Sequence, residues 1–103
     1  MFKDSSELLE YALRKLQVAI EKNEVQVEIL LDERFPNDTN SVKKYCDELE
    51  VKTITELLRE EFKNYDIRSV VESKGYLQGI ITFTKGPCIM AYPLVWILTL
   101  QKK

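Results

Sequence analysis

A short, uninterrupted apolar run near the C-terminus constrains this fold more than any other feature. Residues 94–100 contain five aliphatic side chains, one tryptophan and one threonine, and no charged residue. The charge-free stretch around them, residues 86–101, contains Pro87 and Pro93 and is shorter than the roughly 18 apolar residues of a membrane-spanning helix. A continuous apolar run of this length is typical of a strand that is covered on both faces. We therefore expect residues 94–100 to form the central strand of a sheet.

The N-terminal segment has the periodicity of an amphipathic helix. Leu9, Leu13, Leu16 and Ile20 recur at spacings of four, three and four residues, which places them on one side of a helix. Ser5 or Ser6 can cap the first turn, and Asn23 is a plausible end. Alternating apolar side chains from residue 25 to residue 31 then predict a half-buried strand. Residues 32–40 contain a proline and several Asx residues, which predicts a loop.

Residues 41–64 predict more helix. Val42, Tyr45, Cys46 and Leu49 follow the helical template, and a second apolar stripe begins at Ile54. Thr53 and Glu56 have the spacing of a capping box, so we expect two short helices or one bent helix. A single straight helix is the alternative, because Glu48 and Lys52 would form a favourable pair across the join.

The C-terminal third predicts strands. Residues 67–73 and 76–84 flank a Lys74-Gly75 turn signal and resemble a hairpin. With residues 25–31 and 94–100 this gives an α+β fold, in which two or three helices pack on one face of a sheet of about four strands. The three late strands favour antiparallel pairing, while the helical crossover after the first strand allows one parallel pair. A length of 103 residues fits one domain.

Composition narrows the classes of function. The chain has no histidine, which excludes histidine-dependent triads and histidine-ligated metal sites. Two cysteines are too few for the disulfide framework of a small secreted domain, and the N-terminus does not resemble a signal peptide. We expect a cytoplasmic protein without a cofactor, a bound metal or a membrane partner. The sequence leaves enzymatic activity open and favours a role that is not enzymatic.

An uncharged segment next to the apolar run is the best candidate for a contact surface. A loop is normally polar, yet residues 87–94 carry no charge. Apolar surface that contains methionine and aromatic residues marks interfaces, although burial by the protein's own helices explains the segment equally well. The first hypothesis is therefore a protein-binding or regulatory module, as a homodimer or with another protein. Its candidate interface residues are Cys88, Ile89, Met90, Tyr92, Leu94 and Trp96.

Two other functions rest on charged residues. Residues 51–103 carry eight basic and five acidic residues, whereas residues 1–50 carry seven and twelve. Nucleic-acid binding through the basic half is the alternative hypothesis, with Lys52, Arg68, Lys74 and Lys85 as phosphate contacts. A metal-dependent hydrolase that uses Asp32, Glu33 or Glu72 ranks third, because carboxylates near strand ends can hold a divalent ion.

Overall fold

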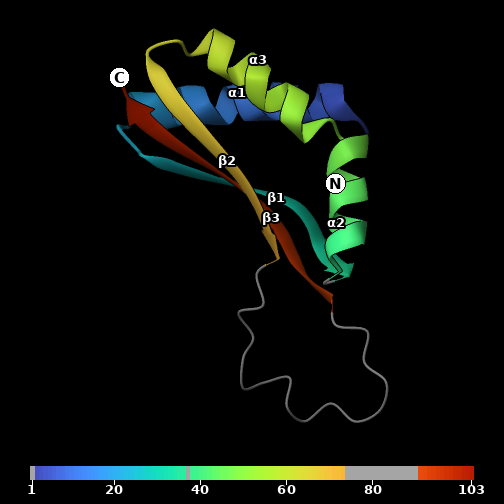
Figure 1. Ribbon diagram of the computed structural model, residues 1–103. Coiled ribbons are helices and arrows are strands. Elements are labelled where there is room, and N and C mark those ends of the chain that lie inside the picture. Colours follow the sequence, from blue (N-terminus) through green and yellow to red (C-terminus); the bar gives the residue numbers. More distant parts are fainter. Residues whose placement is uncertain (1, 37, 74–90) are drawn as a thin grey trace, which may run out of the picture.

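The computed structural model describes residues 2–36, 38–73 and 91–103, and these form three helices and one three-stranded sheet (Figure 1). The order along the chain is helix, strand, two helices and two strands. The elements are α1 (Ser5–Glu21), β1 (Gln26–Pro36), α2 (Thr39–Glu48), α3 (Val51–Glu61), β2 (Tyr65–Ser73) and β3 (Ala91–Lys102). The α+β class predicted from the sequence is confirmed.

The last strand is the centre of the sheet. The strand order is β1-β3-β2, and both neighbours pair with β3 in the antiparallel sense. The prediction that the apolar run 94–100 forms a central strand is therefore confirmed. The parallel pair that the helical crossover allowed is wrong for the described strands, because β1 runs against β3. The predicted strand 76–84 lies outside the described residues, so three of about four expected strands are observed.

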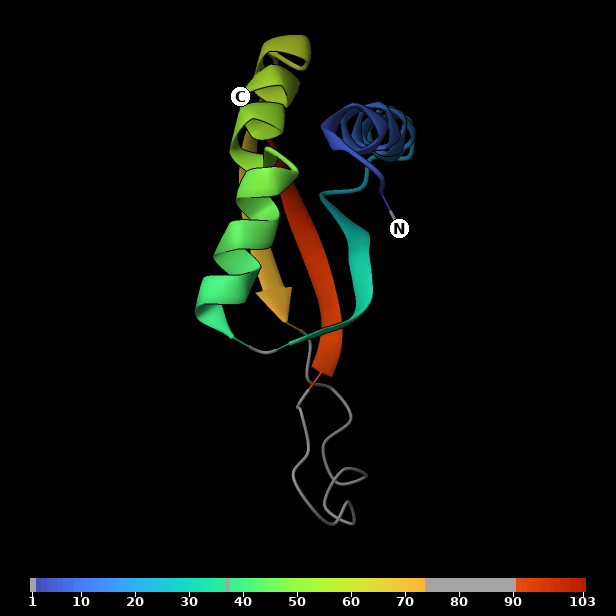
Figure 2. The ribbon, with the colours of Figure 1, turned by 90° about the vertical axis from the view of Figure 1, so that its right-hand side faces the viewer.

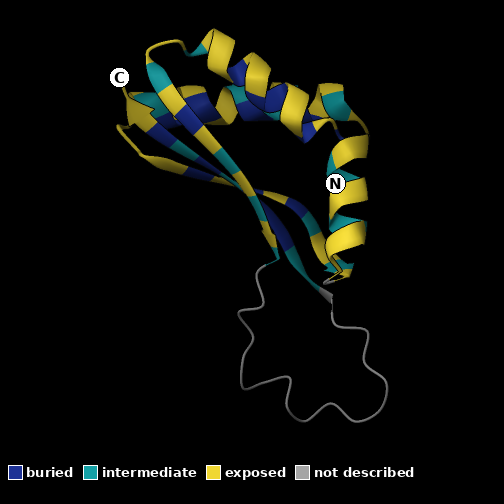
Figure 3. Ribbon diagram, viewed as in Figure 1, coloured by how far each residue is buried: buried dark blue, intermediate teal, exposed yellow. Residues whose placement is uncertain are grey.

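All three helices lie on one face of the sheet, as Figures 1 and 2 show from two directions. In the ribbon of Figure 3 the residues coloured as buried follow the parts of the helices and strands that face one another. One core joins them, and its largest fully buried members are Trp96, Leu8, Leu16, Ile29, Leu31, Ile54, Leu58, Ile67, Leu94 and Leu98. No helix among the described residues is both long enough and apolar enough to cross a membrane.

The buried stripe of α1 is turned slightly from the predicted one. The fully covered residues are Leu8, Ala12, Leu16 and Ala19, whereas Leu9, Leu13 and Ile20 are only half-buried. Two leucines and two alanines thus form the buried face, and Leu9 and Leu13 lie on its flank. The helix is capped by Asp4 instead of Ser5 or Ser6, since the Asp4 carboxylate accepts a hydrogen bond of 2.9 Å from the amide of Glu7.

Two separate helices occupy residues 39–61, which confirms the first reading of this segment and excludes one straight helix. Glu50 breaks the helix with a left-handed backbone (φ 54°, ψ 42°). The predicted capping box is wrong, because α3 begins at Val51 and Thr53 is already inside it. Buried Val51 and Leu49 flank the break. The change of chain direction at Glu50 thus lies between two residues whose side chains both belong to the core.

The first strand is longer than its sequence pattern predicts. β1 continues to Pro36, so the expected loop over residues 32–40 is wrong up to that position. The register against β3 shifts twice, between Leu30 and Asp32 and again between Asp32 and Phe35. Such irregularities absorb extra residues, and an edge strand tolerates a proline. Because of the irregular register, residues 32–36 lack the strict alternation of apolar and polar side chains that would have identified them as a strand.

Candidate interaction surfaces

Two of the predicted interface residues belong to the protein's own core. Leu94 and Trp96 have no exposed surface, since both project from β3 toward the helices. Tyr92 is half-buried. Cys88, Ile89 and Met90 lie outside the described residues. Intramolecular packing therefore accounts for the apolar character of 94 and 96, and a partner surface at 88–90 stays a prediction.

Trp96 is also fixed by a hydrogen bond across the sheet. Its indole Nε1 donates to Ser69 Oγ on β2 at 2.6 Å. A buried indole N–H without an acceptor would be costly, because it loses its hydrogen bond to water. Ser69 thus holds the largest side chain of the core in one orientation.

The described basic candidates do not share a surface. Lys52 is exposed on α3, on the helical side of the molecule. Arg68 is exposed on the other face of β2, where no described helix lies. Lys74 and Lys85 fall outside the described residues. The fold therefore does not gather the two placed residues into one phosphate-binding surface, and nucleic-acid binding stays untested.

The acidic candidates lie on both outer strands. Asp32 and Glu33 are on β1 and Glu72 is on β2, with β3 between them. Asp32 Oδ1 accepts a hydrogen bond of 3.0 Å from the amide of Arg34. Within residues 2–36, 38–73 and 91–103, no group of three or more metal-ligating side chains converges. The geometry of these residues gives no support to a metal-dependent hydrolase.

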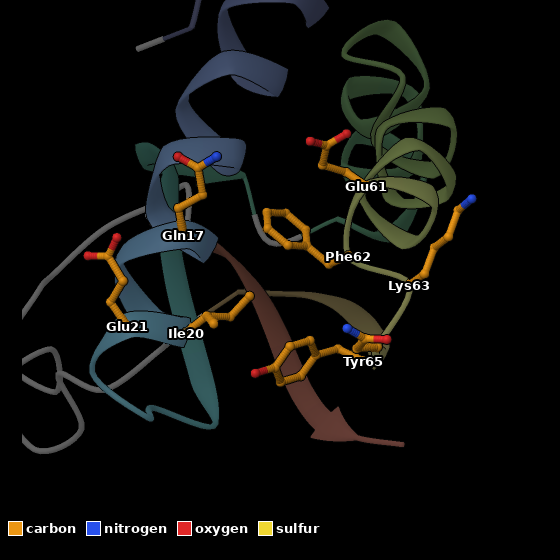
Figure 4. A pocket seen from close by; sticks show the side chains of 8 residues that line it. Gln17, Ile20, Glu21, Glu61, Phe62, Lys63 and Tyr65 are labelled. Atoms are coloured by element: carbon orange, nitrogen blue, oxygen red, sulfur yellow. The ribbon is translucent and has the colours of Figure 1, made fainter.

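One hollow lies between the ends of α1 and α3 and has a volume of about 530 Å³ (Figure 4). Ile20, Phe62 and Tyr65 provide its apolar surface, and Glu21 and Glu61 stand at its rim. Figure 4 shows the Phe62 ring projecting between the two helices. The hollow is open to solvent and presents no nucleophile beside a base, so its form suits a contact with another chain better than chemistry.

The second surface is the face of the sheet that no described helix covers. Leu30, Val70, Val95 and Ile97 lie in adjacent positions on this face, and we call them the open-face cluster. Leu30 pairs with Val95 and Val70 pairs with Ile97 in the two registers. Leu30 is 46% exposed and Val70 is 50% exposed. Leu30 and Val70 are thus in contact with solvent, whereas Val95 between them is buried at 7% exposure, on a face that no described helix covers.

The third surface is the outer edge of β2. The Leu100 amide donates to the Val25 carbonyl at 2.8 Å, so the main chain of Leu100 faces β1. Ile67 is paired with Leu100, and its own main-chain groups therefore point away from β3. The main-chain groups of successive residues in a strand point to opposite edges. Ser69 and Val71 therefore also direct their N–H and C=O groups away from β3. Among the described strands none lies on that side.

A side chain of α3 forms a hydrogen bond with the main chain of this edge. Arg59 Nε donates to the Ile67 carbonyl at 3.1 Å, and the same guanidinium pairs with Glu56 at 2.6 Å. Beyond Ile67 the edge borders a groove of about 330 Å³, in which Val51 and Thr55 of α3 face Ser69 and Val71 of β2. Space for additional side chains therefore exists beside the free part of the edge.

Cys46 also lines this groove but is not a strong nucleophile. Burial of the thiol raises its pKa, and the negative charge of Asp47 acts in the same direction. A thiol with a raised pKa is protonated near neutral pH, whereas the thiolate is the reactive form. The Cys46 thiol is therefore a weak nucleophile in this groove.

The two edges of the sheet differ in how they are protected. β1 has two register shifts, ends in a proline and carries a run of charged residues at 32–34. These features discourage pairing with another strand. β2 keeps an unbroken register with β3 over all nine of its residues and contains neither lysine nor proline. Of the two edges of the described sheet, that of β2 is therefore the less protected against pairing with a further strand.

Comparisons with protein-family models, with curated proteins and with solved structures find no match to this chain. The properties of its surfaces therefore carry the functional argument. Sequence reasoning selected Arg68 and Glu72 for their charge but did not place them beside Val70 on a sheet edge. The alternation of polar and aliphatic residues over 67–73 was the available signal. Only the strand order shows that this strand is an outer one.

Proposed function

We propose that this chain is a protein-binding module that works as a homodimer through β2. The outer edge of β2, which no described strand occupies, carries the proposal. Unpaired main-chain N–H and C=O groups at regular spacing are complementary to another extended strand, which is the basis of β-augmentation. The half-exposed Val70 beside this edge adds apolar area to such a contact.

The surface proposed for the homodimer, the edge of β2, differs from the surface that the sequence indicated. The sequence pointed to residues 87–96, of which Leu94 and Trp96 are buried in the core. β2 lies beside β3, and its open-face side chains are accessible. Support for self-association thus comes from the edge strand and from the open-face cluster.

The test is light scattering after size exclusion, over protein concentrations from about 1 to about 300 μM, since a weak dimer in the micromolar range spans that window. We expect a shift from monomer to dimer mass. A charge next to an exposed edge opposes strand pairing, so Val70→Lys should move the shift to higher concentration. Val18→Lys is the matched control, because Val18 on α1 is 44% exposed and far from the edge in the fold.

A monomer at every concentration would refute the homodimer. An unaltered dimer in Val70→Lys would show that the contact lies elsewhere, for example at the hollow between the ends of α1 and α3. Far-UV circular dichroism of each variant checks that the fold is retained.

A further inference from the structure

We propose that two copies pair their β2 strands in antiparallel register about a twofold axis at Val70, which forms one continuous six-stranded sheet. This inference rests on the proposed homodimer and specifies its geometry. The outward-facing main-chain groups of Ser69 and Val71 restrict the registers, because in an antiparallel pair outward residues must oppose outward residues. A twofold axis at Val70 satisfies this condition by setting Ser69 against Val71 of the second copy, twice.

Charge complementarity selects this register among those the main chain allows. With the axis at Val70, Arg68 of each copy lies directly opposite Glu72 of the other. Both side chains are exposed on the open face, and neither forms an ion pair with any described residue of its own chain. Moving the axis to Arg68 or Glu72 would instead set like charges against each other, which is unfavourable for cross-strand neighbours.

The geometry of the opposed pairs also favours contact between their side chains. Arg68, Val70 and Glu72 direct their main-chain groups toward β3, so across the new interface they form non-hydrogen-bonded pairs. In such pairs the Cα atoms are about 4.5 Å apart and side chains approach most closely. Each dimer therefore gains two Arg–Glu pairs and one Val–Val contact on the open face.

The same register extends the apolar surface across the dimer. Val70 lies next to Ile97 on β3, so the axis creates a row of four aliphatic side chains from two copies. On the helical face, the groove between α3 and β2 gives room to Ser69 and Val71 of the second copy. In each copy the Ile67 carbonyl already accepts a hydrogen bond from Arg59, so the part of the edge that is proposed to pair begins after Ile67.

A charge exchange tests the register. Arg68→Glu sets two carboxylates together and Glu72→Arg sets two guanidinium groups together, so each variant should raise the dissociation constant of the dimer about tenfold or more. The double variant Arg68→Glu with Glu72→Arg restores opposite charges and should recover dimerisation. Sedimentation equilibrium at low salt measures all three against the unaltered protein.

A crosslink tests the axis independently of charge. In a background with Cys46→Ser and Cys88→Ser, Val70→Cys should form a disulfide-linked dimer under mild oxidation, because a non-hydrogen-bonded pair brings the two Cβ atoms into disulfide range. Val25→Cys in the same background is the control, since Val25 is 68% exposed and directly precedes β1, on the far side of the sheet.

The outcomes separate the two proposals. A protein that is monomeric in every experiment refutes both the homodimer and the register. A dimer that persists in the single charge variants, or is not recovered in the double variant, overturns the register and leaves the homodimer standing. Absence of crosslinking through Val70→Cys in a dimeric background likewise overturns the twofold axis at that residue.

Discussion

Individual hydrogen bonds determine how the core of this protein is fixed. Ser69 is a small, half-buried residue on an outer strand, yet its Oγ accepts the indole proton of the one tryptophan in the chain. Tyr45 plays a similar part on α2, where its hydroxyl donates to the Leu31 carbonyl at 3.2 Å and its ring meets Phe35 edge-on at 4.8 Å. Each contact joins a helix or a neighbouring strand to one strand of the sheet.

Replacement of Ser69 by alanine should destabilise the protein. The indole N–H of Trp96 would lose its acceptor inside the core, at a cost of about 1–3 kcal/mol in the free energy of unfolding. Ser69→Thr keeps a hydroxyl and is the matched control. Urea unfolding followed by tryptophan fluorescence measures both variants. Equal unfolding midpoints for Ser69→Ala and the unaltered protein would show that Trp96 finds another acceptor.

Helix ends explain much of the difference between predicted and observed elements. α2 begins two residues before the expected position because Asp38 caps it. The Asp38 carboxylate accepts hydrogen bonds from the Ser41 hydroxyl at 2.7 Å and from the Ser41 amide at 3.3 Å. The sequence pattern identified the apolar face of α2 correctly. It missed the cap, since the surrounding Asx residues are equally typical of a loop.

This cap predicts a pH dependence for α2. The hydrogen bond from the Ser41 hydroxyl, with smaller contributions from the amides of Asn40 and Ser41, lowers the pKa of Asp38 below its ordinary value of 3.8. A group whose pKa is lower in the folded state stabilises that state above the unfolded pKa. The contribution is therefore complete at neutral pH and is lost as the pH falls through 3.8 and then through the folded value.

The variant Asp38→Asn isolates this effect, because an asparagine still caps a helix but does not titrate. We expect the difference in unfolding free energy between the unaltered protein and Asp38→Asn to shrink as the pH is lowered from 7 toward 3. Thermal unfolding by far-UV circular dichroism at several pH values measures it. A difference that is constant over this range would contradict the lowered pKa.

At the scale of the whole molecule, assembly and stability are coupled. If dimers form at the β2 edge, the folded state is stabilised by mass action and the melting temperature depends on protein concentration. We expect Tm to rise by roughly 5 °C between about 1 and about 100 μM. Under the same conditions Arg68→Glu should show a much smaller rise. A melting temperature independent of concentration in the unaltered protein would contradict the coupling.

Local sequence patterns predicted most of the helices and strands, but they did not predict which surfaces are exposed. The apolar run at 94–100 identified the central strand correctly, although the cover on both faces that it was expected to have is given by described helices on one face only (Figures 1 and 2). The stripe on α1 was predicted one position away from the observed one, since Leu8 and Leu9 both fit the helical period. Which strand is exposed at an edge depends on long-range pairing, and no local pattern contains that information.

The strand order has a consequence for the way this chain reaches its folded state during synthesis. Among the described strands, β1 and β2 each pair with β3, which is translated after both of them. Until β3 has left the ribosomal exit tunnel, the apolar sides of β1 and of α1 have no sheet to pack against. Contacts between distant parts of the chain form slowly, because they require the closure of long loops. The apolar sides of β1 and α1 therefore stay uncovered by a sheet until β3 pairs between β1 and β2.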